Sequence, residues 1–485
     1  MPSTLSTLST LSTSSMPSVP AVRRLAAAAA LAVVAAVAAC DDPAGPRPSQ
    51  VLALQVDTTN IGLVRELTVT MREPGPVAVT YAAAGAPTLA LRADSISAVH
   101  RLLLPRLRQG KAYTVRAAAP VDGATAVEAQ FTTDSLPAVL RAIQITQVGQ
   151  ASLPVQLIEV VGATQFGGLL FIEDGQIVGW LNVVGSLFGA TRRAGGTVVL
   201  LDPTLGLVEY DLGGRQRRRL PHPEVGAPTA YGRIHHDVIA TPQNTLYFIA
   251  NETQVVGADT VVGESIWEWA PESGAVTERW SAFDFLDWAT LRGARSVAGN
   301  WLHGNGLSIG PRGNVLMSLR NADHIISIAP DFQSLEWRIG GPTATLRTSE
   351  ADRPLGQHYV SEPSPGRVLV FDNGYERPGG TYSRAIEYQV DLAHDTATKA
   401  WEYRHAPEIY AALVGSARRL PNGNTAIMFG MFAGHNGSSG PITAVEVTPA
   451  GTVTWRLTFG NQLTRLYRVT PVASLLGEVQ VLPPD

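Results

Sequence analysis

The sequence is short of cysteine and of charge. Cys40 is the only cysteine among 485 residues, so an internal disulfide is excluded. Charged residues make up 16% of the chain, whereas soluble domains average about 25%. The 37 lysines and arginines nearly balance the 41 aspartates and glutamates, which leaves a formal net charge of −4, and they are not gathered into an extended block. A nucleic-acid partner is therefore not expected.

Long amphipathic helical stripes are also missing. The sequence instead contains 46 glycines and 33 prolines, many of which punctuate short apolar runs. Such runs between turn residues are typical of β-strands. Because 45% of the residues are hydrophobic, which is ordinary for a packed protein, the composition also argues against a largely disordered chain. The fold class that we expect is all-β, with room for more than one domain.

No apolar run is long enough to cross a membrane as a helix. Arg23 and Arg24 precede an uncharged run from Leu25 to Ala39, whose 15 residues fall short of the roughly 20 that a spanning helix needs. A basic start, an apolar run and small residues before a cleavage point are typical of a secretory signal peptide. We therefore predict a signal peptide over residues 1–39 and export of the chain.

The single cysteine stands directly after this run. Its place behind Val37, Ala38 and Ala39 resembles the lipobox of bacterial lipoproteins. The resemblance implies lipid attachment at Cys40, which would anchor the protein to a membrane of the bacterial cell envelope, on the periplasmic or the outer surface. An ordinary secretory signal with an incidental cysteine is the alternative. Residues 40–50, rich in proline and polar residues, are expected to form a tether.

Short strand-like runs follow the tether in quick succession. They predict a β-sandwich over residues 51–135, similar to immunoglobulin or fibronectin type III domains. The phrase from Leu107 to Tyr113 resembles the tyrosine corner of such domains, in which the tyrosine hydroxyl ties down a neighbouring loop. A buried strand tyrosine is the alternative for Tyr113. The expected strands are 51–56, 67–71, 77–81, 88–91, 112–117 and 126–131.

Beyond about residue 140 the strands lengthen and one pattern recurs. An apolar strand meets a turn of proline, glycine or asparagine and continues into a second strand, and a further strand-turn-strand then ends near a tryptophan. Repeated units of this kind predict a β-propeller over residues 140–485, with about six blades and a closing strand within residues 467–476. A seven-bladed propeller and a β-helix are the alternatives. The clearest hairpins cover residues 237–249, 306–319, 360–371 and 417–429.

Several histidines stand at the start of these units. His235 and His236, His303 and His358 each precede the first strand of a unit, and Arg320 ends the hairpin that His303 begins. In a propeller the first strands line the central channel, so these imidazoles are expected to meet there. Since neighbours on a strand point to opposite faces, only one of His235 and His236 is expected to face the channel. Imidazoles and a guanidinium in one funnel suit an anionic ligand.

An ordered set of phrases surrounds these histidines. It consists of His235-His236-Asp237, residues 301–305 (WLHGN), Gly356-Gln-His358, residues 368–374 (VLVFDNG) and residues 382–388 (YSRAIEY). This set resembles the motifs of the bacterial aryl-sulfate sulfotransferases, over at least residues 235–401 and more loosely at Tyr467-Arg468. The sequence has no glycine-rich phosphate loop, in keeping with a family that uses no nucleotide sulfate donor. The resemblance implies neither a cofactor nor a metal.

The resemblance also implies a reaction: transfer of a sulfuryl group from an aryl sulfate donor to a phenolic acceptor. His358 would be the nucleophile and would form a sulfohistidine intermediate, which makes the reaction ping-pong. Arg320 and one of His235, His236 or His303 would stabilise charge on the sulfuryl oxygens. A protonated histidine would also donate to the leaving phenolate.

Three further residues fall in the candidate site. Asn305 would donate a hydrogen bond to the sulfuryl oxygens or orient His303. Tyr382 and Arg384 would either bind the substrate or stitch the blade together. The segment Asp372-Asn373-Gly374 is expected to be a simple turn.

Two functions from other classes are left open by the sequence. Several imidazoles in one channel suit a transition metal, so a metal-dependent propeller enzyme is one alternative, although Arg320 would repel a cation. A non-catalytic, lipid-anchored binding propeller is the other. The chain lacks the disulfide that members of the resembled family can carry near the active site. Association into a homodimer is also left open.

Overall fold

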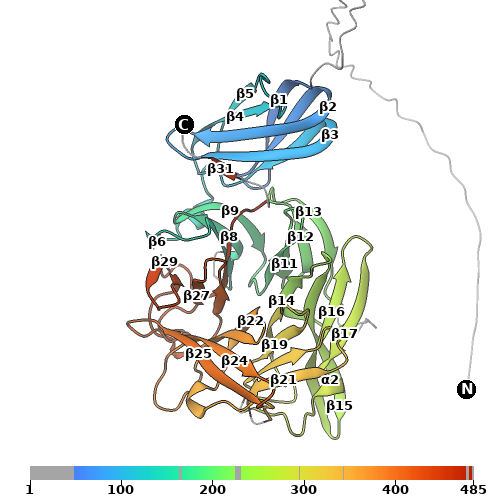
Figure 1. Cartoon of the computed structure of the whole chain (residues 1–485), viewed down its shortest axis with the longest axis vertical. Helices are drawn as coiled ribbons and strands as arrows, with labels where there is room; N and C mark the ends of the chain where they lie inside the picture. The colour runs from blue at the N-terminus through green and yellow to red at the C-terminus, as the bar shows by residue number, and fades with distance from the viewer. Residues whose placement is uncertain are drawn as a thin grey trace, which may run out of the picture. The chain divides into compact units, whose positions relative to one another are not determined.

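The chain folds almost entirely into strands joined by turns (Figure 1). The computed structural model describes residues 49–162, 166–223, 231–293, 295–341, 343–476 and 480–482. Within these ranges the helices α1 (Ala138–Arg141) and α2 (Ala282–Phe285) are single turns, as are the 3-10 segments η1 (Glu350–Asp352) and η2 (His435–Gly437). The all-β prediction is therefore confirmed.

The membrane-related predictions fall on the start of the chain. The predicted signal peptide, Cys40 and nearly all of the tether lie outside the described residues. In the described ranges, no helix is long and apolar enough to span a membrane.

The N-terminal strands form one sheet. The long antiparallel strands β2 (Arg65–Ala83) and β3 (Thr88–Leu104) lie at its centre. The order is β31-β3-β2-β4-β5, with β1 paired to β2. Side chains along β2 alternate between buried and more exposed, as a half-buried strand requires. The shorter strands are β1 (Val51–Thr58), β4 (Ala112–Ala118), β5 (Val127–Thr132) and β31 (Gln480–Leu482).

This sheet differs from the expected row of short strands. The predicted strands 67–71 and 77–81 are two parts of β2, which continues through an irregular register at Gly75. The first part pairs with β1 and the second with β4, while β1 also contacts β5, so the sheet folds over itself. Residues 72–76 (REPGP) have the composition of a turn, which is why the sequence pattern divided the strand. The immunoglobulin-like sandwich stays a prediction.

The contact expected of a tyrosine corner is present. The Tyr113 hydroxyl accepts a hydrogen bond from the backbone N–H of Arg108 at 2.8 Å. Tyr113 is also buried on β4, so the two interpretations of this residue hold together.

The remaining strands of the described residues form six sheets of four or five strands. The expected hairpins are present as the antiparallel pairs β14–β15, β18–β19, β22–β23 and β26–β27. Three of the tryptophans that end the repeats, Trp280, Trp337 and Trp455, are buried. The sheets are β30 (Leu466–Val472), β7 (Val155–Val160), β8 (Gly167–Glu173), β9 (Gln176–Val183); β10 (Ala190–Arg192), β11 (Val198–Asp202), β12 (Gly206–Tyr210), β13 (Gln216–Leu220); β14 (Ile234–Ala240), β15 (Leu246–Val256), β16 (Asp259–Ala270), β17 (Ala275–Ser281); β18 (Gly304–Ile309), β19 (Val315–Leu319), β20 (His324–Ile328), β21 (Leu335–Gly340); β22 (His358–Ser364), β23 (Arg367–Asp372), β24 (Arg384–Asp391), β25 (Thr396–Arg404); and β26 (Ser416–Arg419), β27 (Thr425–Phe429), β28 (Thr443–Val447), β29 (Val453–Phe459), β6 (Ile145–Gly149).

The first strands of these sheets surround a common channel. β10, β14, β18, β22, β26 and β30 contact one another in succession, and residues of all six strands line a cavity of about 400 Å³. The predicted closing strand is confirmed, because β30 returns to pair with β7. One strand that the sequence pattern did not reveal, β6, pairs with β29 at the edge of the last sheet. Repeated sheets around one channel make this part of the fold propeller-like.

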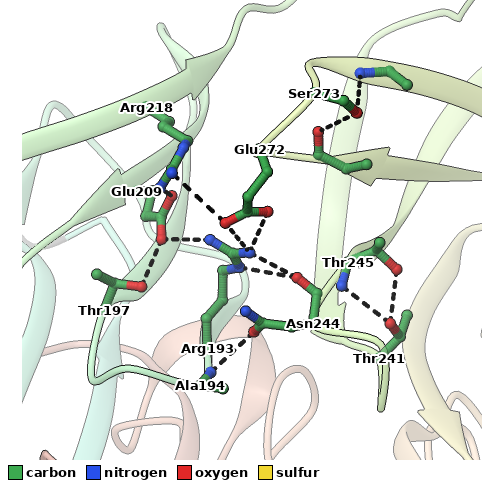
Figure 2. Close-up of polar contacts among 12 residues, drawn as sticks. Arg193, Ala194, Thr197, Glu209, Arg218, Thr241, Asn244, Thr245, Glu272 and Ser273 are labelled. Carbon is green, nitrogen blue, oxygen red and sulfur yellow. Dashed lines mark hydrogen bonds and ion pairs between the residues drawn. The ribbon is translucent and has the colours of Figure 1, made fainter.

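Polar networks tie neighbouring sheets together, and Figure 2 shows one of them. Arg193 follows β10 and is 4% exposed. Its guanidinium contacts the carboxylates of Glu209 on β12 at 2.7 Å and of Glu272, just after β16, at 2.8 Å. It also donates to the backbone oxygen of Asn244 at 2.7 Å. The network therefore joins the sheet that begins with β10 to the sheet that begins with β14.

Loss of this guanidinium is expected to be costly. We expect Arg193→Met to lower the free energy of unfolding by about 3 kcal/mol, because the buried Glu209 loses its closest cationic partner. Arg218→Met is the control, since Arg218 contacts the same carboxylate at 3.1 Å but its side chain is 40% exposed. Its loss should cost less than about 1 kcal/mol. Urea unfolding followed by circular dichroism measures both, and equal effects would contradict the assignment.

Candidate functional site

Three of the first strands begin with a shared irregularity. The register of each hairpin shifts near the start of its first strand, which re-aims the side chains there. The shifts fall between His235 and Val238, between Gly304 and Gly306, and between His358 and Val360. At or beside these shifts His236, His303 and Tyr359 have φ values of 57°, 54° and 52°, a conformation that residues with side chains seldom adopt outside functional sites.

The bulge at His235 and His236 overturns one expectation. Both residues, and not only one of them, line a single cavity of about 270 Å³ together with His303. The Nδ1 atoms of His235 and His236 lie 2.9 Å apart, and the rings of His236 and His303 lie 4.6 Å apart. The simple alternation of strand side chains failed because the extra residue interrupts it.

His358 is the first residue of β22 and is 4% exposed. Its Nδ1 lies 2.8 Å from the Oδ1 atom of Asn373, which follows β23 directly. The backbone N–H of Val414 donates to its Nε2 atom at 3.3 Å. Its ring also lies 6.2 Å from the ring of Tyr467 on β30. The imidazole is thus held between the ends of several first strands.

The contacts of Asn373 fix which nitrogen of His358 carries the proton. The Nδ2 atom of Asn373 donates to the backbone oxygens of Ala411 at 2.7 Å and Val414 at 2.8 Å. Its Oδ1 atom must therefore face His358 as an acceptor, so His358 Nδ1 carries the hydrogen and Nε2 keeps its lone pair. Asn373 is more than the turn residue that the sequence indicated. The sequence signal for this role was the position of Asn373 within residues 368–374, one of the phrases that resemble the family motifs.

Burial keeps the four imidazoles neutral. It lowers the pKa of His235 to about 3 and the pKa of His303 to about 4. The pKa values of His236 and His358 lie well below the ordinary 6.5, mainly because both rings are buried. For His358 the Arg320 guanidinium lowers the pKa further. The protonated histidine that the sequence led us to expect is therefore absent at neutral pH, since desolvation disfavours the charged form.

Arg320 supplies positive charge beside these neutral rings. Within the described residues it forms no ion pair: its Nη1 atom donates to the side chain of Asn321 at 3.1 Å, and its Nε atom is buried without a partner. Its guanidinium lies 5.6 Å from the centre of the Tyr375 ring. Burial and the neighbouring Arg295 guanidinium lower the pKa of Arg320. A half-buried cation without an ion-pair partner is suited to hold an anionic group.

Asn305 supports His358 rather than His303. Its Nδ2 atom donates to the backbone oxygen of Gln357, the neighbour of His358, at 2.9 Å. Its Oδ1 atom is buried without a partner. The backbone oxygen of Asn305 accepts a hydrogen bond from the Tyr467 hydroxyl at 2.8 Å. Among the described residues Asn305 has no contact with His303, and its free Oδ1 atom is an acceptor that cannot donate to sulfuryl oxygens.

A buried ion pair lies beneath the histidines. Arg468 contacts both carboxylate oxygens of Asp237, at 2.6 and 2.8 Å, and both side chains are buried. Asp237 directly follows His236, and Arg468 lines the cavity of about 400 Å³. The pair therefore links the strand that carries His235 and His236 to the wall of that cavity. The partners are 231 residues apart in the chain, so no local motif reveals the contact.

Tyr382 and Arg384 belong to the framework. Arg384 is buried, and its Nε atom donates to Asp372 at 2.8 Å, a carboxylate that also contacts Arg377. The Tyr382 ring lies beneath the guanidinium of Arg404, 3.6 Å from the ring centre. No contact described here joins either residue to His358. Of the two expected roles, these contacts favour a structural role, in which the two residues hold the strands and loops of this sheet together.

One carboxyl group adds to the histidine cavity. Glu264 on β16 lines it, and burial raises the pKa of Glu264 to about 7. One of its oxygens accepts the backbone N–H of Gly304 at 3.0 Å, and the other is without a partner. Across the described residues, no group of three or more histidine, cysteine, aspartate or glutamate side chains is arranged to hold a metal ion.

Residues 161–468 match the family model described as Arylsulfotransferase (ASST). The chain belongs to the arylsulfotransferase family. The match includes all of the histidines discussed above, Arg320 and Arg468, and it confirms the family resemblance drawn from the sequence. Membership supports aryl sulfotransferase activity in general terms.

Solved structures that resemble this member of the arylsulfotransferase family include distant ones. No curated protein matches the chain significantly. Among solved structures, a streptogramin B lyase is 12% identical, with 66% of this chain and 74% of that chain covered and a TM-score of 0.32. A quinonprotein alcohol dehydrogenase-like protein from Bacteroides thetaiotaomicron is 9% identical, with 85% and 95% covered and a TM-score of 0.33. Such likenesses say nothing about the activity of this chain.

Proposed function

We propose that the protein transfers a sulfuryl group from an aryl sulfate to a phenol through a sulfohistidine at His358. The observation that carries this proposal is the hydrogen bond from His358 Nδ1 to Asn373, which leaves the Nε2 lone pair free of a proton. A neutral imidazole with an unprotonated nitrogen is a competent nucleophile at pH 7. Before attack, the long hydrogen bond from the Val414 N–H to Nε2 must break, so that the lone pair can reach the sulfur atom.

Two displacement steps complete the reaction. In the first, the Nε2 lone pair attacks sulfur, an N–S bond forms, and the S–O bond to the donor ring breaks, so that the donor leaves as a phenolate. In the second, the oxygen of the acceptor phenol attacks the same sulfur, the N–S bond breaks, and the imidazole is restored. The acceptor gives up its proton and the donor phenolate gains one. Glu264 lines the histidine cavity with His236 and His303 and would take up the acceptor's proton in the second step, while the donor phenolate takes its proton from solvent after it leaves.

Charge stabilisation falls to Arg320 in this proposal. The histidines are neutral at pH 7, so they contribute as hydrogen-bond donors, whereas the unpaired guanidinium of Arg320 carries a full positive charge. The protein mainly positions the sulfuryl group and stabilises charge on its oxygens, as in phosphoryl transfer.

The proposal extends to the setting of the enzyme. We place the six sheets as the blades of a six-bladed propeller behind an immunoglobulin-like sandwich. The signal peptide over residues 1–39 and a lipid on Cys40 would anchor the exported protein to the cell envelope. Palmitate labelling that disappears in Cys40→Ala tests the anchor.

The activity is tested with 4-nitrophenyl sulfate as donor. Release of 4-nitrophenol should be stimulated by an acceptor phenol, and the acceptor should be recovered as its sulfate. Release that phenols do not increase above the rate in water alone would indicate a hydrolase. No release with a panel of phenols would favour the two alternatives, a metal-dependent propeller enzyme or a binding propeller.

The donor half-reaction should be insensitive to mild acid. Without an acceptor, the burst rate of 4-nitrophenol release requires neutral His358, whose pKa in the folded state lies well below 6.5. We therefore expect the burst rate to hold steady as pH falls through 6.5 and to decline only well below it. Stopped-flow absorbance at the isosbestic wavelength of nitrophenol measures this rate. A midpoint near 6.5 would contradict the buried, neutral imidazole.

Asn373 is expected to act as a positioning residue. Asn373→Leu removes the acceptor for His358 Nδ1, so the ring can turn or change tautomer, and kcat should fall about 10²-fold. Asn373→Asp keeps an acceptor and adds a negative charge beside the ring. It should retain more activity than the leucine variant and move the acid limb of the burst rate to higher pH, because the carboxylate raises the His358 pKa. Identical pH profiles for all three proteins would show that Asn373 has only a structural role.

A further inference from the structure

The channel continues beyond the buried pair of Asp237 and Arg468. The continuation is the cavity of about 400 Å³, which none of the four histidines lines. Its walls come mainly from the six first strands, and residues of β7, β8 and β11 complete them. Ser308, Ser361 and Arg418 are only partly buried, so solvent reaches the cavity. The two halves of the channel are therefore separate spaces.

Two unpaired guanidinium groups line this cavity. Within the described residues, neither Arg192 nor Arg418 forms an ion pair, and the Nε atom of each is buried without a hydrogen-bond partner. Arg192 donates to the backbone oxygen of Leu475 at 3.0 Å, and burial lowers the pKa of its guanidinium. The guanidinium of Arg418 lies 5.2 Å from the centre of the Tyr359 ring. Both side chains are half-buried and carry no protein counter-ion within the described residues, so an anion in the cavity could pair with them.

Hydroxyl groups and apolar side chains complete the lining. The Oγ atoms of Ser308 and Ser361 are buried without a partner. Leucine, isoleucine and valine side chains and the Tyr359 ring form the rest of the wall.

The carboxylates of the cavity are already engaged. Glu362 accepts hydrogen bonds from Asn314 at 2.8 Å and from the backbone of Gly366 at 2.8 Å. Glu159 accepts the backbone N–H of Gly189 at 2.9 Å, and burial raises the pKa of Glu159 to about 7. Within the described residues, neither carboxylate forms an ion pair with Arg192 or Arg418.

We infer that this half of the channel is a second binding site, for a small organic anion with an apolar or aromatic body and a sulfonate, sulfate or carboxylate head. Arg192 and Arg418 would bind the head group, with Ser308 and Ser361 as additional donors, and the apolar wall would hold the body. Pockets of this size and mixed lining are typical of small-molecule sites. The site is independent of sulfuryl transfer, because it shares none of the groups that we place in catalysis.

Calorimetric titration with benzenesulfonate tests the inference. A sulfonate cannot act as donor, since its sulfur is bonded to carbon, so binding is measured without turnover. The full chain with His358→Ala and Arg320→Gln serves as the starting protein, because these changes weaken binding at the catalytic end. We expect one remaining site, at least tenfold weaker after Arg418→Gln or Arg192→Gln. Benzenesulfonamide, which has the same shape without the charge, should not bind.

The outcomes separate clearly. Arg312→Gln is the matched control, since Arg312 lies on the exposed β18–β19 turn and pairs with Glu336. It should leave the affinity unchanged. No binding by the starting protein, equal binding of the sulfonamide, or affinity that survives both channel substitutions would overturn the inference. Because the assay needs no reaction, it gives its answer whether or not the chain transfers sulfuryl groups.

Discussion

His358→Ala should lose about 10⁴-fold or more of the phenol-dependent release of 4-nitrophenol from 4-nitrophenyl sulfate. The substitution removes the only atom to which the account assigns the N–S bond. The position of Nε2 is set by the contacts of the His358 ring with Asn373 on one side and Val414 on the other. A neighbouring group cannot replace it, because no other side chain is held at that position by these contacts. Steady-state kinetics over a range of donor and acceptor concentrations measure the loss.

A second buried histidine provides the control for this prediction. His324 on β20 is also buried and its pKa is also lowered, to about 4, but its contacts are with the backbone of Ala322 and with Thr343. His324→Gln should retain most of the activity of the folded protein. Thermal unfolding verifies that both variants fold. If His358→Ala keeps its activity, or if both histidines matter equally, His358 is not the nucleophile.

Arg320→Gln is expected to give the next largest loss, about 10²- to 10³-fold in kcat. Glutamine keeps a hydrogen-bond donor of similar length but removes the positive charge. The charge matters most when electron density builds up on the sulfuryl oxygens and the leaving phenolate, so kcat should fall more than KM rises. Arg320→Lys should recover part of the rate, because it restores the charge without the planar guanidinium. Rapid kinetics of the first turnover separate this effect from product release.

Arg292→Gln is a suitable control for the loss of an arginine. The guanidinium of Arg292 lies 3.7 Å from the centre of the Trp288 ring on an exposed segment. Its replacement should change kcat by less than about threefold, in line with the small weight of exposed charges. A purely structural role for Arg320 would instead lower thermal stability and leave the kcat of the folded fraction unchanged.

The repeated hairpins could be predicted from the sequence because their turns are chemically explicit. Proline, glycine and asparagine between apolar runs marked the pairs β14–β15, β18–β19, β22–β23 and β26–β27, and the closing strand β30 followed from the need to complete the ring. The same rule failed at residues 72–76, where turn-like residues lie within one long strand. Composition identifies residues that permit a turn, whereas pairing with β1, β3 and β4 decided that β2 continues.

The candidate site shows the same division. His303, His358 and Arg320 could be recognised because they recur at the starts and ends of hairpins. The roles of Asn373 and Arg468 could not, since they depend on contacts with Val414, 41 residues away, and with Asp237, 231 residues away. The orientation of His235 and His236 depended on a bulge, which single-strand periodicity does not contain. The local sequence pattern thus identified the candidate catalytic residues, whereas tertiary contacts determined how their side chains are oriented.

The most direct measurement is mass spectrometry of the peptide that contains His358 after the protein reacts with 4-nitrophenyl sulfate in the absence of an acceptor. This peptide should gain the mass of one SO₃, the gain should match the burst of nitrophenol, and an acceptor phenol should remove it. Sulfuryl transfer that proceeds with no modified peptide, or with the added mass on another residue, would contradict a sulfohistidine at His358.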